Sequence, residues 1–87
     1  MDYIDINKKI SARMSCFCTG LSYQTLKNDI EKDRLKAIKT EKGHYQIRVI
    51  DLIDYADYLH HSNRNILVCP MGVIKHRVRY AVFGIYD

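Results

Sequence analysis

The chain has 87 residues and a formal net charge of +4 at pH 7, and hydrophobic residues make up 47% of it. This length allows one domain with a modest core and leaves no room for a separate catalytic domain. The hydrophobic fraction is too high for a disordered chain, and no apolar run approaches the roughly 20 residues that span a bilayer. The first residues are acidic and then polar, which does not fit a secretory signal, so we expect a cytoplasmic protein without a membrane partner.

The three cysteines, Cys16, Cys18 and Cys69, are an odd number and cannot all pair within one chain. Because no secretory signal is recognised, we expect reduced thiols. A zinc site that combines these thiols with histidines is a poor alternative, since neither C-x-x-C nor H-x-x-x-H spacing is present. We therefore expect no metal and no other cofactor.

A first helix is predicted over about residues 8–18, where apolar residues recur at helical spacing. Its N-cap is expected to be Asn7, or Asp5 slightly earlier. Thr19 and Gly20 then end the helix, because glycine takes up the left-handed conformation that a helix C-terminus requires.

A second, shorter helix follows this turn, with Ser22 as its predicted N-cap. Leu26 and Ile30 lie four residues apart and are expected to face the core, whereas the opposite face is polar. A short helix with hydrogen-bonding side chains in its first two turns is typical of a recognition helix. A solvated surface helix explains the same pattern equally well.

A basic β-hairpin is predicted from Leu35 to Arg48, with Gly43 near its tip, where the turn requires a residue that tolerates positive φ. Ile38 and Ile47 are expected to point to the core, while basic and polar side chains point outward. In a DNA-binding domain such a hairpin is called a wing, because it contacts the backbone next to the groove that the helix occupies.

A third helix is predicted to begin at Asp51 or just before it. Asp51, Asp54 and Asp57 form an acidic stripe that would repel a phosphate backbone, so this helix is expected to face away from DNA. Use of these carboxylates for metal binding or acid–base chemistry would need a cleft and partners, and the sequence indicates neither. The adjacent His60 and His61 are expected to end the helix, where cationic side chains suit the helix dipole.

Residues 62–87 are predicted to form a C-terminal β-hairpin extension that packs on the same domain or on a partner. The turn is placed at residues 70–72 and the second strand over residues 73–85, which are rich in β-branched and aromatic residues. This extension carries four Lys/Arg against one Asp, whereas residues 1–61 carry ten Lys/Arg against nine Asp/Glu. Because apolar edge strands are usually covered, packing or dimerisation is favoured over a direct nucleic-acid surface here.

Short motifs between residues 15 and 59 carry a resemblance to a known family. They are the Thr19-Gly20-Leu21-Ser22 turn with Thr25, Leu26 and Ile30, the Leu35-Lys-Ala-Ile38 strand entry, the Gly43-His44-Tyr45 tip with Ile47, and Asp51-Leu52. On these residues the segment resembles the excisionase-type and MerR-type winged helix-turn-helix domains of bacteria, phages and mobile elements. The resemblance implies an α+β fold of about three helices and a wing over residues 1–61. The extra C-terminal β-hairpin, predicted from its own residues, has no counterpart in the family.

The resemblance also implies sequence-specific binding of double-stranded DNA. The second helix would enter the major groove, where Gln and Asn suit adenine edges and Lys suits guanine, while the wing holds the adjacent backbone or minor groove. Asp29, Glu31 and Asp33 make this helix acidic for that role; Asp29 and Asp33 are expected to turn toward the core edge or solvent, and Glu31 outward. The predicted DNA-binding residues are Ser22, Tyr23, Gln24, Thr25, Lys27, Asn28, Lys39, Lys42, His44, Gln46 and Arg48.

Several roles stay open for such a protein. An excisionase-like protein would bend DNA and direct a recombinase, and a regulator would repress or activate a promoter. The alternative is a phage-encoded protein-binding module on the same scaffold, for example an inhibitor of a host defence nuclease. In any of these roles, residues 65–86 are expected to contact a possible second copy of the chain, a recombinase or a host protein. An enzyme is not expected, because no nucleophile–base pairing, phosphate loop or metal spacing is found.

Overall fold

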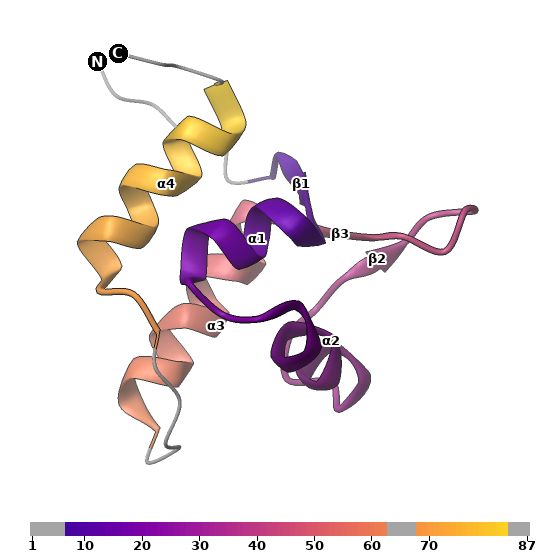
Figure 1. Cartoon of the computed structure of the whole chain (residues 1–87), viewed down its shortest axis with the longest axis horizontal. Helices are drawn as coiled ribbons and strands as arrows, with labels where there is room; N and C mark the ends of the chain where they lie inside the picture. The colour runs from indigo at the N-terminus through magenta and orange to yellow at the C-terminus, as the bar shows by residue number, and fades with distance from the viewer. Residues whose placement is uncertain (1–6, 63–67, 84–87) are drawn as a thin grey trace.

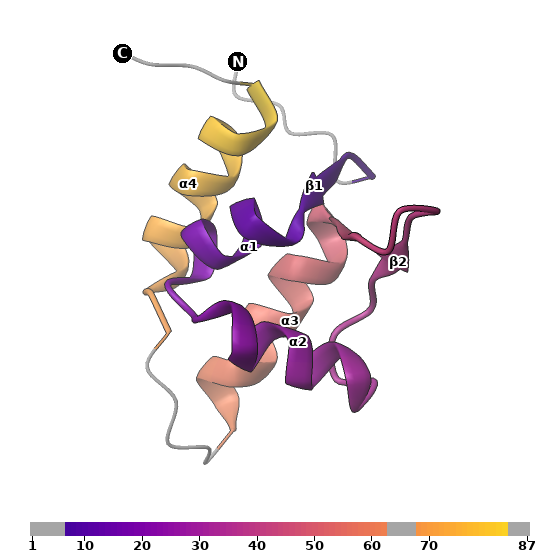
Figure 2. The same cartoon turned by 45° about the vertical axis from the view of Figure 1, so that its right-hand side comes forward.

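The computed structural model describes residues 7–62 and 68–83, which form an α+β fold of four helices and a three-stranded antiparallel sheet (Figure 1). In chain order the elements are β1 (Lys9–Ser11), α1 (Ala12–Thr19), α2 (Tyr23–Glu31), β2 (Ile38–Lys39), β3 (Tyr45–Arg48), α3 (Val49–His61) and α4 (Met71–Phe83). The predicted α+β class is confirmed. In Figures 1 and 2, α1 lies centrally, with α4 on one side and the β2–β3 hairpin on the other.

A short strand, β1, joins the sheet ahead of α1. Ile10 faces Ile47 across the antiparallel β1–β3 register, and both side chains are buried. On its other edge β3 pairs with β2, so the strand order is β1-β3-β2. The predicted helix over residues 8–18 is therefore wrong at its start, because a single apolar residue such as Ile10 fits the period of a strand as well as that of a helix.

The start of α1 is fixed by a local cap. The Ser11 hydroxyl accepts a hydrogen bond from the Met14 backbone N–H at 3.1 Å, which satisfies one of the unpaired donors of the first turn. Ser11 thus takes the place of the predicted N-cap Asn7, and Asp5 lies outside the described residues.

The turn between α1 and α2 has the predicted chemistry. Gly20 is left-handed, with φ of 78°, and the Ser22 hydroxyl caps α2 by accepting from the Thr25 backbone N–H at 3.2 Å. The turn also meets the chain that leads into α4, because the Cys69 N–H donates to the Thr19 carbonyl at 2.9 Å. A Cβ at Gly20 would lie 2.7 Å from Cys69 Sγ, so this contact has no room for a side chain.

The hairpin is confirmed, with one side chain misassigned. Gly43 has the predicted positive φ, 84°, and Ile47 is fully buried. Ile38, in contrast, is 44% exposed, so its predicted place in the core is wrong. Ile38 lies opposite Gln46 in the β2–β3 register. Since successive side chains of a strand point to opposite faces, Ile38 shares the face of Gln46 and not that of Ile47.

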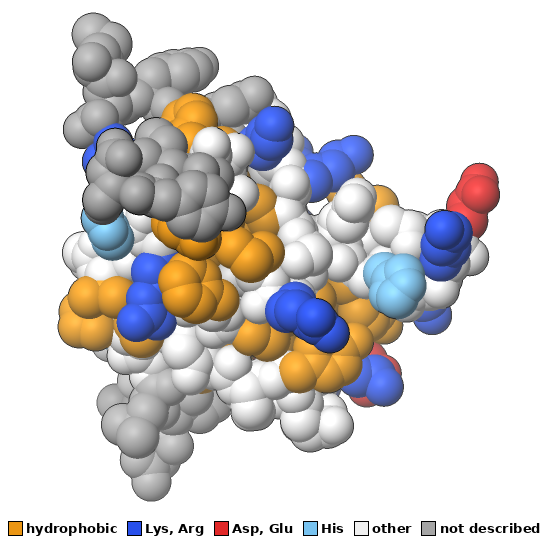
Figure 3. Space-filling model, turned by 45° about the horizontal axis from the view of Figure 1, so that its top comes forward, with side chains coloured by type: hydrophobic (Ala, Val, Ile, Leu, Met, Phe, Trp, Pro, Cys, Tyr) orange, Lys and Arg blue, Asp and Glu red, His pale blue; other side chains and the backbone are white. Residues whose placement is uncertain are grey.

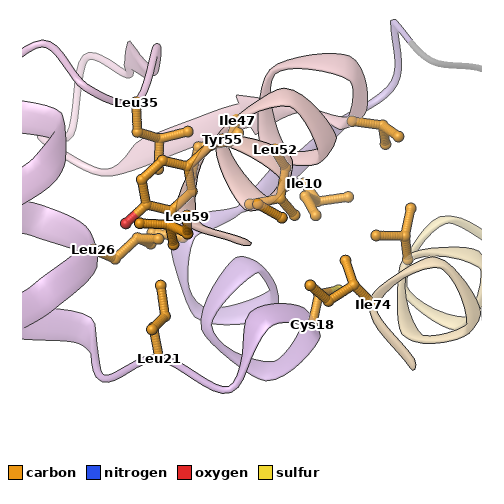
Figure 4. Packing of buried hydrophobic residues seen from close by; sticks show 14 residues of the cluster. Ile10, Cys18, Leu21, Leu26, Leu35, Ile47, Leu52, Tyr55, Leu59 and Ile74 are labelled. Atoms are coloured by element: carbon orange, nitrogen blue, oxygen red, sulfur yellow. The ribbon is translucent and has the colours of Figure 1, made fainter. Parts of the chain in front are cut away.

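One hydrophobic core joins the helices and the sheet (Figure 4). Figure 4 shows Cys18 and Ile74 at the α1–α4 end of this core, and Leu21, Leu26 and Tyr55 at the α2 end. The helix α3 runs through it and contributes more buried residues than any other described element: Val49, Leu52, Tyr55, Ala56 and Leu59.

The helix α3 begins at Val49, two residues before Asp51, and His60 and His61 occupy its last turn as predicted. On its outer side, Asp54 and Asp57 are exposed. In the part of the chain that the structure describes, no helix is both long enough and apolar enough to cross a membrane.

The predicted C-terminal β-hairpin is wrong, because residues 71–83 form the helix α4. Ile74 and Val78 lie one helical turn apart and are fully buried in the core, where α4 packs on α1 and α3. Pro70 precedes the first turn, and its carbonyl accepts from the Ile74 N–H at 3.0 Å, a position in which proline is tolerated. The β-branched residues of this segment thus follow their tertiary packing instead of their intrinsic preference. The remaining hairpin residues, 63–67 and 84–87, lie outside the described chain.

The three cysteines are all free thiols. Cys18 lies on the side of α1 that packs in the core and is fully buried. Burial raises the pKa of its thiol from 9.0 to about 11, against the opposing charge of Arg77. Burial also raises the pKa of the half-buried Cys16 thiol. A raised thiol pKa favours folding only while the unfolded thiol is protonated, so this contribution is complete below pH 9 and is lost as the pH rises through about 11.

We expect Cys18 to react slowly with iodoacetamide. At pH 9 a thiol with a pKa near 11 is about 1% thiolate, whereas an ordinary thiol is about half ionised, so alkylation should be about fiftyfold slower. Peptide mass spectrometry after timed labelling measures the rate at Cys18 itself. The same protein in urea is the control and should be alkylated quickly; equal rates in the native and unfolded states would contradict the predicted burial.

We predict that Gly20→Ala destabilises the protein by about 2–5 kcal/mol, because alanine adds left-handed strain and a contact with Cys69 Sγ. Gly43→Ala is the matched control, since its φ is also positive but its nearest neighbour lies 4.0 Å away, so it should lose only about 1–2 kcal/mol. Urea unfolding followed by circular dichroism measures both changes. In the Gly20→Ala, Cys69→Ala double variant, part of the stability lost through Gly20→Ala should be regained. If the two changes are additive instead, the predicted clash between the new Cβ and Cys69 Sγ is wrong.

Candidate nucleic-acid interface

The helix α2 exposes the polar face predicted for it. Leu26 is fully buried, while Gln24 and Asn28 are exposed and Lys27 is half-buried. Tyr23, in the first turn, is 51% exposed, so its ring projects from the start of the helix instead of filling the core. The first two turns of α2 therefore offer aromatic, amide and ammonium groups to a ligand.

Two of these amides form a pair. Gln24 Nε2 donates to Asn28 Oδ1 at 3.0 Å, one helical turn along α2. This bond uses one N–H of Gln24 and one lone pair of Asn28 Oδ1, fixes the two amides relative to each other, and leaves Gln24 Oε1 and Asn28 Nδ2 to bond a ligand. One acceptor and one donor, held together, match the N6 donor and N7 acceptor that adenine presents in the major groove.

The acidic residues in and after α2 differ in how far they are exposed. Asp29 is buried, as expected for a turn toward the core edge, and its carboxylate accepts a hydrogen bond from the Tyr55 hydroxyl of α3. The Arg34 guanidinium lies 3.6 Å from the same carboxylate. Glu31 is exposed, as predicted, and Asp33 lies beyond the end of α2 with φ of 60°. Asp29 thus ties α2 to α3 and presents no charge to a ligand.

The hairpin presents its basic residues at and near a tip that is closed by hydrogen bonds. Lys39, Lys42 and His44 are exposed. The tip is closed by hydrogen bonds from the Thr40 N–H to the His44 carbonyl at 2.7 Å and from the His44 N–H to Thr40 Oγ1 at 3.2 Å. Lys39 Nζ lies 5.8 Å from the centroid of the Tyr45 ring. These contacts fix the backbone that carries the cations.

Other predicted residues are already engaged within the chain. The half-buried Arg48 binds Asp51 through Nε at 2.9 Å and Nη2 at 3.5 Å, so its charge is balanced at the start of α3. Thr25 is half-buried and accepts from the Ser22 hydroxyl at 2.9 Å. Gln46 is half-buried in β3. Arg48, Thr25 and Gln46 are therefore less accessible to a ligand than the residues described above. Ser22, in contrast, is exposed.

A hollow lies between α1, the start of α2 and the hairpin. It brings together Tyr23 and His44, which are 21 residues apart in sequence and were both predicted site residues. Arg13 of α1 and Tyr45 of β3 also line it and were missed. The predicted helix over residues 8–18 did not show which of its side chains face the hairpin. Only the folded structure places Arg13 near His44 and Tyr45, around the same hollow. The remaining lining residues are Ser11, Ala12 and Cys16.

The charged side chains on the face that includes α1 and the hairpin are mainly basic. Figure 3 shows Lys and Arg side chains spread from the hairpin across the middle of the molecule to α4, with Asp and Glu visible only on its right-hand part. No residue of the acidic helix α3 lines the hollow. The arrangement suits a polyanion that follows the hollow and touches both α2 and the hairpin.

Comparison with known proteins adds no assignment: no family model, curated protein or solved structure matches this chain. Among residues 7–62 and 68–83, no group of three or more His, Cys, Asp and Glu side chains is arranged to hold a metal ion. The function is therefore inferred from the surface that α1, α2 and the hairpin form.

We expect Tyr55→Phe to cost about 2 kcal/mol of stability, because it removes the hydroxyl that binds the buried Asp29 carboxylate. Asp29→Asn, which keeps an oxygen acceptor, should cost less than Asp29→Ala. The matched control is Tyr58→Phe on the same helix, which removes the hydroxyl of a side chain that is 45% exposed and should change stability by less than about 0.5 kcal/mol. Urea unfolding of the single and double variants measures the coupling, and additive losses at Asp29 and Tyr55 would contradict this contact.

Proposed function

We propose that this chain is a sequence-specific double-stranded DNA-binding protein of the winged helix-turn-helix type. The observation that carries the proposal is the hollow in which Tyr23 of α2 and His44 of the hairpin meet Arg13 of α1. A recognition helix and a wing must flank one binding surface, and these residues belong to the elements that would have those roles. The order α1, α2, hairpin, α3 supports the same interpretation.

In the proposed complex the first two turns of α2 enter the major groove. The paired Gln24 and Asn28 recognise an adenine edge. Lys27, which lies between them in sequence and one turn after Gln24, contacts a guanine edge or a phosphate. The exposed hydroxyl of Ser22 lies at the helix N-terminus, where the dipole favours a phosphate.

The hairpin holds the backbone beside that groove. Lys39, Lys42 and His44 supply its positive charge, and Arg13 approaches the same strand from the opposite wall of the hollow. Contacts to phosphates fix the register of the protein on the duplex and carry no sequence information themselves. Substitutions in α2 should therefore change sequence specificity, and substitutions of Arg13 or the hairpin cations should change the salt dependence of binding.

A single module of this size buries only about 600–1,000 Å² on DNA. Useful affinity would come from repeated sites, from a homodimer or from a recombinase bound alongside. We place the protein in the cytoplasm of a bacterial host, as an excisionase-like directionality factor or a small transcriptional regulator of a phage or mobile element. The buried Asp29 supports this proposal, because it removes one of the negative charges that would oppose binding.

The proposal is tested by fluorescence anisotropy with a target selected from a random duplex pool. We expect binding that weakens steeply between 50 and 200 mM salt, as phosphate contacts require. Arg13→Ala and Lys42→Ala should each reduce the log–log salt slope by about 1, since each removes one phosphate contact. Lys75→Ala on α4 is the matched control and should leave the slope unchanged.

The base contacts need a different readout. Gln24→Ala and Asn28→Ala should each weaken binding to the selected target by about tenfold while affinity for random duplex and the salt slope stay as in the wild type. Absence of duplex binding by the wild type at 50 mM salt would overturn the proposed function. An unchanged affinity of a Lys27→Glu, Lys42→Glu double variant would overturn it as well.

A further inference from the structure

A second surface, built by α1 and α4, combines exposed apolar side chains with an arginine. We define the α1–α4 patch as Phe17, Val73, Arg77, Tyr80 and Phe83. Phe17 and Phe83 are 44% and 45% exposed, and Val73 is 38% exposed. Single exposed apolar side chains are common, so what distinguishes the patch is that they occur together. No residue of the patch lines the hollow between α2 and the hairpin.

The centre of the patch is held rigidly. The Arg77 guanidinium carbon lies 5.0 Å from the centroid of the Phe17 ring, and Arg77 Nη1 donates to the Phe17 carbonyl at 2.9 Å. The rings of Phe17 and Tyr80 lie 5.9 Å apart at 52°. A stacked arginine and aromatic rings that already contact one another are among the residue types on which protein–protein affinity usually depends.

The helix α4 carries apolar side chains on two of its sides. Ile74 and Val78 are fully buried against α1 and α3. Val73, Arg77 and Tyr80, at intervals of four and three residues, follow a different side of the helix, next to Phe17. Val73 on this side is exposed, while Arg77 and Tyr80 are half-buried. Exposed apolar side chains that are grouped mark an interaction site more often than an isolated one does.

The charge of the patch selects among partners. Neither α1 nor α4 contains Asp or Glu, and Arg77 is the charged residue of the patch, since Lys75 and Arg79 each lie two residues from it, on the opposite side of α4. On the left of Figure 3, over α1 and α4, orange and blue side chains lie side by side and no red one is visible. A second copy docked patch to patch would bring two Arg77 side chains together without a carboxylate. A duplex would gain nothing from the exposed rings, since phosphates do not pack on apolar surface.

We propose that the α1–α4 patch docks an acidic, amphipathic segment of another protein. Apolar side chains of that segment pack on Phe17 and Val73, and a carboxylate pairs with the guanidinium of Arg77, which can accept it in a bidentate geometry. This surface goes beyond the proposed DNA binding and does not depend on it.

The test uses a phage-displayed library of random 12-residue peptides, selected on the immobilised wild-type protein. Enriched sequences should combine Asp or Glu with Leu, Ile or Phe, and a synthetic copy of one of them is then titrated in solution. Arg77→Glu and Val73→Glu should each weaken its binding by tenfold or more, the loss expected at the centre of an interface. Circular dichroism confirms that both variants are folded.

Lys75→Glu is the matched control, because it makes the same charge change on α4 at an exposed position two residues from Arg77, on the opposite side of the helix. It should weaken peptide binding by less than about threefold. Failure to enrich any peptide, enrichment of basic peptides, or equal losses for Lys75→Glu and Arg77→Glu would overturn the proposal. So would a wild-type dimer that Val73→Glu dissociates, or a lower salt slope of duplex binding in Arg77→Glu.

Discussion

The close approach of the chain to Gly20 is the constraint on which the arrangement depends. The α1–α2 turn has to be left-handed at this residue, and the same absence of a side chain admits Cys69 from the segment that leads into α4. The hydrogen bond from Cys69 to Thr19 then holds that segment in place. One glycine therefore sets the direction in which α2 leaves α1 and the position from which α4 starts, so both proposed binding surfaces are arranged around it.

A buried acid explains how an acidic helix is compatible with a polyanionic ligand. Asp29 faces inward and binds the hydroxyl of Tyr55, so the charge that looks unfavourable in the sequence serves to attach α2 to α3. The arginine that approaches this carboxylate comes from the turn just after α2, which keeps the pair local. The first two turns of the exposed face are left to amides, a lysine and a tyrosine, and Glu31 is exposed at the C-terminal end of α2. The net charge of a helix is thus a poor guide to the charge that a ligand meets.

The features predicted correctly from the sequence are those governed by local backbone chemistry. Gly20, Ser22 and Gly43 have the predicted conformations or caps because glycine and serine act on their nearest neighbours. The strand β1 and the helix α4 were mispredicted because their residues fit two periods, and packing against distant elements decides between them. The hollow could be predicted only in part. Tyr23 and His44 were identified as site residues, but Arg13 belongs to the site only because the fold brings it near a hairpin more than 20 residues later in the chain.

The brevity of α1 has a consequence for how the two surfaces relate. With eight residues the helix is about 12 Å long, and Arg13 and Phe17 are separated by about 6 Å along its axis. A duplex in the hollow and a protein on the α1–α4 patch would therefore be neighbours, with their facing surfaces close enough to touch. A partner acidic enough to bind Arg77 would also meet the phosphates across that short distance. Its negative charge would have to be confined to the side that faces α4, and a partner that is acidic on all sides would compete with DNA.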